Sequence, residues 1–175
     1  LGRGRQTDAL VRRLMDLPQP LVLDADGINA LAGHMDEWER RRGRVTVLTP
    51  HEGEFLRVGG DLSQGRTAAA EDFARRSGAV VVLKGPGTVV AGPDDRCRVN
   101  TTGNCGMAKG GSGDVLSGVV LALLGLGMDA FDACCCAVWL HGRAGDLAAQ
   151  EKGQWGMTPT DLLERLPQAL REVTE

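Results

Sequence analysis

Short, nearly continuous apolar runs rich in valine alternate with longer helical patterns along the first half of the chain. The apolar runs are found at 21–24, 45–49 and 79–84. Runs of this length that end at a polar residue are typical of strands buried on both faces of a parallel sheet. The helical patterns are found at 7–16, 52–58 and 67–76. This alternation predicts an α/β fold in which helices cover a mostly parallel central sheet.

The second half of the chain begins with a different pattern. Residues 88–91 and 97–100 are short apolar stretches separated by the turn sequence GPDDR, which predicts a hairpin. From Gly103 onward the pattern is helical, and Thr158 and Asp161 have the spacing of a capping box at the start of the last helix. Neither a repeat nor a linker interrupts the sequence, so we expect one domain over residues 1–175.

Composition narrows the classes of protein that fit. The 175 residues include 20 basic and 23 acidic side chains, for a net charge of −3, and 42% are hydrophobic. These values are typical of a globular domain and argue against a disordered chain and against a nucleic-acid-binding surface. The longest apolar run, 115–128, contains several glycines and falls short of the ~20 residues of a membrane span. We therefore expect neither nucleic acid nor a membrane as a partner.

Two runs of potentially reactive residues have structural interpretations. Cys134, Cys135 and Cys136 are consecutive in a helical stretch, so their thiols cannot converge on one metal ion. We expect them to be small packed residues in a reducing, cytoplasmic protein. The charged run at 37–44 is interpreted as a solvated helix face, and His141 as a packed helix residue.

Glycine is about twice as frequent as in an average protein, with 25 residues. The densest cluster is the segment TTGNCGMAKGGSGDVLSG at 101–118, a glycine loop that leads into an apolar helix. Its glycines at 103, 106, 110, 111 and 113 are expected to let successive backbone amides approach one phosphate. Asp114, in the first helical turn, is a candidate general base. The alternative is a plain glycine turn in which Asp114 only caps the helix.

Three polar clusters follow the predicted strands. They comprise Asp24, Asp26 and Asn29, then Thr49, His51, Glu52 and Glu54, and finally Lys84, Gly85, Gly87 and Thr88. Each cluster alone fits turn, cap or solvated residues. Because the carboxyl ends of parallel strands meet at one sheet edge, together they predict a single site. Asp24 and Asp26 share a face in extended chain and suit Mg²⁺ held through water, but two carboxylates are too few to assign metal ligands.

Four segments, LVLDADGINAL, LTPHEGEF, VVLKGPGT and TGNCGMAKGGSGDVLSG, occur in this order. In sequence and spacing they resemble the ADP- or ATP-dependent NAD(P)H-hydrate dehydratases, a carbohydrate-kinase-like family of the ribokinase-like superfamily. The resemblance runs from Leu1 to about Leu170. It implies a three-layer α/β/α sandwich of the ribokinase-like kind. It also implies hydrated NADH or NADPH as substrate, ADP or ATP with Mg²⁺, a homo-oligomer such as a tetramer, and a fused or partner NAD(P)H-hydrate epimerase.

The resemblance also implies roles for individual residues. Asp114 is the implied catalytic base, and the hydrated nucleotide is implied to lie beside Gly2, His51 and Asp114. The implied adenine-nucleotide residues are Lys84, Gly85, Pro86, Gly87, Thr88 and Gly113. Residues implied to support the site are Asp24, Asp26, Asn29, Glu54, Asn104, Gly110, Gly111 and Ser112.

The chain begins at Leu1 inside a glycine-containing loop, and the family domain has roughly another third of its length before this point. We therefore expect a chain that lacks its N-terminal portion.

Three hypotheses about function remain: a hydro-lyase that restores NAD(P)H, a small-molecule kinase of the same fold, and an inactive nucleotide-binding fragment. The kinase would act on a hydroxymethylpyrimidine, a thiazole or a sugar. The PHEGE motif and the pair Asp24 and Asp26 favour the hydro-lyase over the kinase.

Overall fold

The computed structural model describes residues 1–174. One five-stranded sheet has its strands in chain order. The strands are β1 (Leu21–Leu23), β2 (Thr46–Leu48), β3 (Val80–Leu83), β4 (Val89–Ala91) and β5 (Cys97–Val99). β1, β2 and β3 pair in parallel, whereas β4 and β5 continue the sheet as an antiparallel hairpin. The α/β fold and the hairpin are confirmed, with parallel pairing confined to the first three strands.

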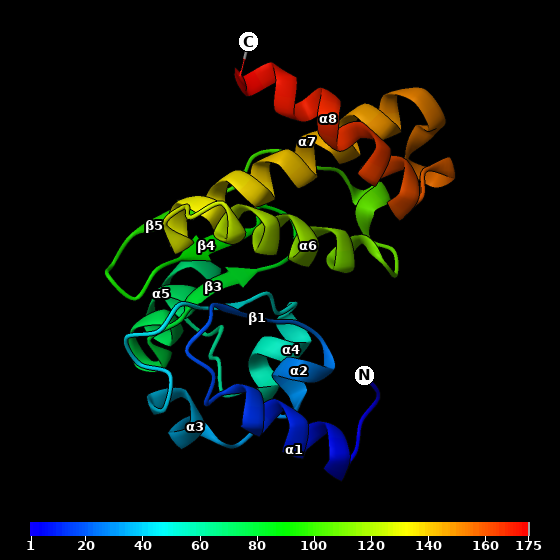
Figure 1. Ribbon diagram of the computed structural model, residues 1–175. Helices are drawn as coiled ribbons and strands as arrows, with labels where there is room; N and C mark the ends of the chain where they lie inside the picture. The colour runs from blue at the N-terminus through cyan, green and yellow to red at the C-terminus, as the bar shows by residue number, and fades with distance from the viewer. Residues whose placement is uncertain (175) are drawn as a thin grey trace.

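Helices cover both faces of this sheet (Figure 1). One face carries α1 (Arg5–Leu14), α2 (Asp26–Asn29), α3 (Met35–Glu39), α4 (Glu52–Arg57) and α5 (Arg66–Ser77). The other face carries α6 (Ser112–Gly125) and α7 (Ala130–Gly156), with α8 (Pro159–Thr174) packed on α7. A short 3₁₀ turn, η1 (Cys105–Met107), precedes α6. Because strand order follows chain order, right-handed crossovers place the connecting helices on one face, which leaves the other face for α6 and α7.

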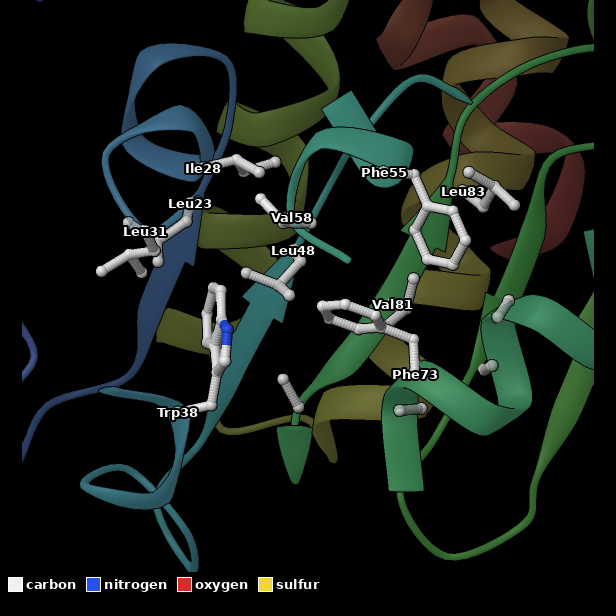
Figure 2. Close-up of a cluster of buried hydrophobic side chains, with 14 of the residues drawn as sticks. Leu23, Ile28, Leu31, Trp38, Leu48, Phe55, Val58, Phe73, Val81 and Leu83 are labelled. Atoms are coloured by element: carbon white, nitrogen blue, oxygen red, sulfur yellow. The ribbon is translucent and has the colours of Figure 1, made fainter. Parts of the chain in front are cut away.

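Strand β3 shows how the sequence builds two cores. Val81 and Leu83 point into the core on the α5 side, whereas Val80 and Val82 point into the core under α6 and α7. All four are buried, which explains the continuous apolar run. Figure 2 shows the first core, where the Phe73 ring lies close to Val81. The Phe55 and Phe73 ring centroids are 5.3 Å apart, within the range of favourable aromatic pairs.

The last two helices are joined by a short turn. Gly153 has non-helical backbone angles near the end of α7, where φ is 71°. The predicted capping box at the start of α8 is confirmed, since Asp161 Oδ2 accepts from the Thr158 amide at 2.8 Å. In return the Thr158 hydroxyl oxygen accepts from the Asp161 amide at 3.3 Å. The turn between the helices therefore has fixed geometry beside the glycine loop.

The interpretation of the charged run at 37–44 as a solvated face is wrong at Arg41, which is 2% exposed. Its guanidinium donates to the carbonyl oxygens of Leu17 and Gln19 at 2.7 and 2.8 Å and to the Thr46 hydroxyl at 2.7 Å. These carbonyls belong to the segment before β1. A buried cation is retained here because it satisfies several buried acceptors at once.

The cysteine run is packed as predicted. Cys134 is buried, and Cys135 and Cys136 are half-buried. Burial raises the pKa of Cys135 to about 11, which keeps this thiol protonated and weakly reactive at neutral pH.

Within residues 1–174, no helix has both the length and the apolar content needed to cross a membrane.

Candidate functional site

The carboxyl ends of β1 and β3 meet at the start of α6. Lys84, directly after β3, donates from Nζ to Oδ1 of Asp24, directly after β1, at 2.7 Å. Ser117 on α6 donates its hydroxyl to Asp24 Oδ2 at 3.4 Å. The Lys84 and Asp24 side chains are only 22% and 16% exposed. The prediction that the strand-end clusters converge at one edge is confirmed for this pair.

Gly113 brings the first turn of α6 directly onto this ion pair. A Cβ atom at position 113 would lie 3.3 Å from both Asp24 Oδ2 and Lys84 Nζ. Nothing within residues 1–174 accepts a hydrogen bond from the amides of Gly113 or Asp114. Open amides at a helix start, reinforced by the helix dipole and a nearby ammonium group, are suited to bind an anion, so this is the candidate anion site.

The glycine loop offers fewer open amides than the sequence predicts. The Gly103 amide donates to Asp146 Oδ2 on α7 at 2.9 Å, and the Gly106 amide donates to Asn104 Oδ1 at 3.0 Å. Asn104 Nδ2 in turn donates to Asp146 Oδ1 at 2.9 Å. The expectation that all five glycines serve one anion is therefore wrong. The anion site is narrowed to the end of the loop and the first turn of α6.

His51 is the N-cap of α4. Its Nδ1 accepts from the amides of Gly53 and Glu54 at 3.0 and 3.3 Å, and Glu54 Oε2 accepts from the His51 amide at 2.9 Å. Since Nδ1 is an acceptor, the ring proton of the neutral form is on Nε2. The side chain is 57% exposed. A β-bridge pairs His51 with Lys84, so both lie at the same sheet edge.

Gly2 and Asp26 contact each other near the carboxyl end of β1. The Gly2 amide donates to Asp26 Oδ2 at 3.0 Å, and Asn29 Oδ1 at the end of α2 accepts from Arg57. These residues, except Gly2, line a hollow of about 230 Å³. The arrangement joins the start of the chain to the segment that follows β1. The position of Gly2 beside the substrate stays a prediction.

Asp24 and Asp26 do not share a face. Ala25 between them has φ 48° and ψ −117°, in the region with positive φ that non-glycine residues rarely adopt. Asp24 consequently contacts Lys84 while Asp26 contacts Gly2. The shared-face interpretation is therefore wrong, because the chain is not extended at Ala25. Among residues 1–174 no group of three or more His, Cys, Asp or Glu side chains is placed to hold a metal ion.

The turn 84–88 is held by Arg66, which sequence reasoning missed. Arg66 Nη2 donates to the Leu83 carbonyl oxygen at 2.9 Å, and Nη1 donates to that of Pro86 at 2.5 Å. A Cβ atom at Gly85 would lie 2.7 Å from Arg66 Nη2, so glycine is needed for this approach. The Thr88 hydroxyl closes the turn by donating to the Gly85 carbonyl oxygen at 3.1 Å. No local sequence signal marks Arg66, which begins α5.

His141 on α7 is buried, as predicted, and also contacts the start of α6. Its Nε2 lies 2.8 Å from the Ser112 carbonyl oxygen. Burial lowers the pKa of His141 to about 4, and the positive charge of Lys84 acts in the same direction, whereas the bond to Ser112 opposes the shift. The imidazole is therefore neutral at pH 7 and lies against the peptide that joins Ser112 to Gly113.

Asp114 is exposed in the first turn of α6 and makes no side-chain hydrogen bond to any residue of the described chain. Its carboxylate is therefore open to a ligand. The structure brings Lys84 and Asp24 together and places Gly113 against them. It does not join the Asp114 carboxylate to another predicted site residue by a hydrogen bond within residues 1–174.

The amino-acid sequence matches the family model described as NAD(P)H-hydrate dehydratase over residues 1–168. The bifunctional NAD(P)H-hydrate repair enzyme Nnr of Thermofilum pendens is 44% identical over 180 residues. That alignment covers 100% of this chain and 34% of the relative. The ADP-dependent (S)-NAD(P)H-hydrate dehydratase of Neisseria meningitidis serogroup B is 39% identical over 160 residues, covering 87% of this chain and 54% of that protein.

Among solved structures, the ADP/ATP-dependent NAD(P)H-hydrate dehydratase from Bacillus subtilis, co-crystallized with ATP/Mg²⁺, is similar with a TM-score of 0.84 and 34% identity. The match covers 98% of this chain and 61% of the Bacillus chain. A ribokinase-like superfamily protein from Enterococcus faecalis is similar with a TM-score of 0.83. The chain thus spans about a third of the Thermofilum relative and three-fifths of the Bacillus structure. The similarity to the Enterococcus structure confirms the ribokinase-like fold.

Proposed function

Because the chain belongs to the NAD(P)H-hydrate dehydratase family, with residues 1–168 matching it, we propose that it catalyses the nucleotide-dependent dehydration of hydrated NADH or NADPH. The observation that carries this proposal is the contact of Gly113 with the Lys84–Asp24 pair, beneath the open amides of α6. This geometry suits a transferable phosphoryl group, whose charge is spread over several oxygens.

The proposed reaction has two steps. In the first, the ring hydroxyl of the hydrated nicotinamide attacks the terminal phosphorus of ADP or ATP, and Asp114 accepts the hydroxyl proton. A new oxygen–phosphorus bond forms while the bond to the leaving nucleotide breaks, releasing AMP or ADP. In the second, phosphate departs with the carbon–oxygen bond electrons, and the neighbouring carbon loses a proton to form the double bond. The exposed, unbonded carboxylate of Asp114 supports its assignment as the base.

The nucleotide is proposed to bind between two glycine elements. Lys84, Gly85, Pro86, Gly87 and Thr88 form the turn after β3, and Gly113 begins α6. The contact of Gly113 with Lys84 supports one continuous site for both. Mg²⁺ fits as an ion held mainly by the nucleotide's own phosphate oxygens and water, because Asp24 is already engaged by Lys84. Bound in this way, it would neutralise charge on the phosphates.

The hydrated substrate is proposed to lie on the other side of the phosphoryl group, beside Gly2, His51 and Asp114. Asp26 supports this by fixing the Gly2 amide, and Glu54 supports it by fixing the backbone of His51. The bifunctional names of relatives support an epimerase as a fused or partner activity. A homo-oligomer, such as a tetramer, stays a prediction from the family resemblance, and a cytoplasmic location stays a prediction from the cysteine residues.

Product analysis tests the proposal. The purified protein is incubated with hydrated NADH and either ADP or ATP, and absorbance of the reduced nicotinamide is followed together with phosphate release. The expected result is the return of NADH, with one phosphate released for each molecule of NADH formed. A stable phosphorylated hydrate would indicate a kinase instead, and nucleotide binding without turnover would indicate a binding protein. Either of these two results would contradict the dehydratase proposal.

A further inference from the structure

We propose that His141 is a positioning residue that holds the phosphoryl-binding peptide at the start of α6. The imidazole reaches from α7 to the Ser112 carbonyl oxygen, 2.8 Å from Nε2. Ser112 and Gly113 are joined by one peptide unit, and Gly113 supplies an open amide. The inference rests on the proposed function in one respect, because it treats that amide as a donor to the nucleotide phosphate.

The chemistry of the contact fixes the direction of the hydrogen bond. A carbonyl oxygen only accepts, so the imidazole must donate from Nε2 and the neutral ring must carry its proton there. The Ser112 carbonyl and the Gly113 amide are opposite ends of one planar group. A donor on the oxygen therefore fixes the plane of this peptide and polarises it, which makes the Gly113 N–H a stronger donor.

The surroundings explain why a neutral donor is suited to this position. Lys84, whose charge acts on His141, also lies close to Gly113, because a Cβ atom at position 113 would be 3.3 Å from Lys84 Nζ. A permanently charged donor at position 141 would repel the Lys84 ammonium group and would itself be buried without an acid partner. Imidazole with a depressed pKa supplies an N–H at neutral pH without adding a second buried charge.

The rest of this α7 segment also contacts the glycine loop. A Cβ atom at Gly142 would lie 2.2 Å from the Thr102 hydroxyl oxygen, so the loop packs directly on the helix backbone. Asp146, five residues beyond His141, binds the Gly103 amide at 2.9 Å. The segment thus holds both ends of the glycine loop, and His141 is its contact with the phosphoryl-binding end.

The test compares His141→Leu, which removes the donor, with His141→Gln, whose amide nitrogen can donate from a similar position. The first readout is the Gly113 amide-proton chemical shift in the nucleotide-free protein. The second is the Kd for ADP from calorimetry. We expect the leucine variant to move the Gly113 resonance upfield and to weaken ADP binding by about tenfold, the size of one lost hydrogen bond. Glutamine should restore most of both values.

Arg143→Met is the matched control, because it removes the contact of α7 with Glu172 on α8 and leaves α6 untouched. It should change neither readout. An unmoved Gly113 resonance in His141→Leu would overturn the proposal. If that variant does not fold, the ¹⁵N shifts of the wild-type imidazole decide the matter: a proton on Nε2 supports the proposal and one on Nδ1 overturns it. A wild-type protein that binds no ADP would overturn the proposed function, and the Gly113 resonance would then decide on His141 alone.

Discussion

A methyl group at position 113 would lie 3.3 Å from both Lys84 Nζ and Asp24 Oδ2, closer than most Cβ contacts. Gly113→Ala should therefore push the ion pair aside without preventing the helix from forming, and we expect ADP binding to weaken by about tenfold, the effect of about 1.4 kcal/mol. Calorimetry measures this change.

Gly118→Ala is the matched control, since a Cβ there meets nothing within 4 Å and lies in the same helix. It should leave ADP affinity unchanged and raise the free energy of unfolding by up to about 1 kcal/mol, because alanine favours helix. Equal Kd values for the two variants would show that the close approach at Gly113 has no part in binding.

His51 combines a structural and a proposed binding role, which two substitutions separate. His51→Asn keeps an N-cap for the amides of Gly53 and Glu54, so stability should be nearly unchanged. His51→Ala removes the N-cap, so its free energy of unfolding should fall by about 1 kcal/mol. Both should raise the KM for hydrated NADH about tenfold while ADP affinity stays constant. Steady-state kinetics and calorimetry provide the check, and an unchanged KM in both variants would remove His51 from the substrate site.

At the scale of elements, the turn 84–88 depends on α5 for its shape. Arg66→Met removes two hydrogen bonds to the carbonyl oxygens of Leu83 and Pro86. We expect the free energy of unfolding to fall by about 1–3 kcal/mol and ADP binding to weaken. Arg75→Met, which removes an exposed ion pair from the same helix, should change both values little. Denaturant unfolding and calorimetry test both expectations. Unaltered ADP affinity in Arg66→Met would contradict the proposal that the turn 84–88 binds the nucleotide.

The strands were predicted well because each lies in a nearly continuous apolar run. In β3, burial on both faces leaves no polar position, and β1 consists of three apolar residues. α2 was not predicted, since four residues are too few to show periodicity. The helix face expected at 37–44 corresponds in part to α3, which ends at Glu39. The prediction that Arg41 is solvated was wrong for another reason. Charge in a sequence indicates exposure, and only the folded chain shows the carbonyl oxygens that surround this guanidinium.

At the scale of the whole molecule, parallel-sheet topology was sufficient to predict that Asp24 and Lys84 converge, and the family resemblance placed Gly113 of the glycine loop with Lys84. The contacts from α7 were beyond reach, because His141 and Asp146 lie 29 and 43 residues from their partners Ser112 and Gly103. No spacing rule connects residues that far apart on different elements. The same reason explains why the five loop glycines were all expected to bind the anion.

Burial of His141 makes the stability of the whole molecule sensitive to acid. The pKa of His141 is lowered from 6.5 to about 4 in the folded protein, so between these values the unfolded chain binds a proton that the folded one does not. The free energy of unfolding should therefore fall as pH drops from about 6.5 to 4, by about 3 kcal/mol at most from this residue. His141→Gln should remove that part of the slope in denaturant unfolding at several pH values. An identical slope in both proteins would contradict the prediction.

The central claim is that Asp114 is the base that starts phosphoryl transfer from the nucleotide to the hydrated nicotinamide. Asp114→Asn keeps the shape and the helix start but cannot take up a proton, so the most direct measurement is its kcat for hydrated NADH with ADP beside its Kd for ADP. We predict a loss of about 10²–10⁴ in kcat with nearly unchanged Kd. A kcat close to that of the wild-type protein would contradict the account, because Asp114 would then be a helix-start residue without a part in the chemistry.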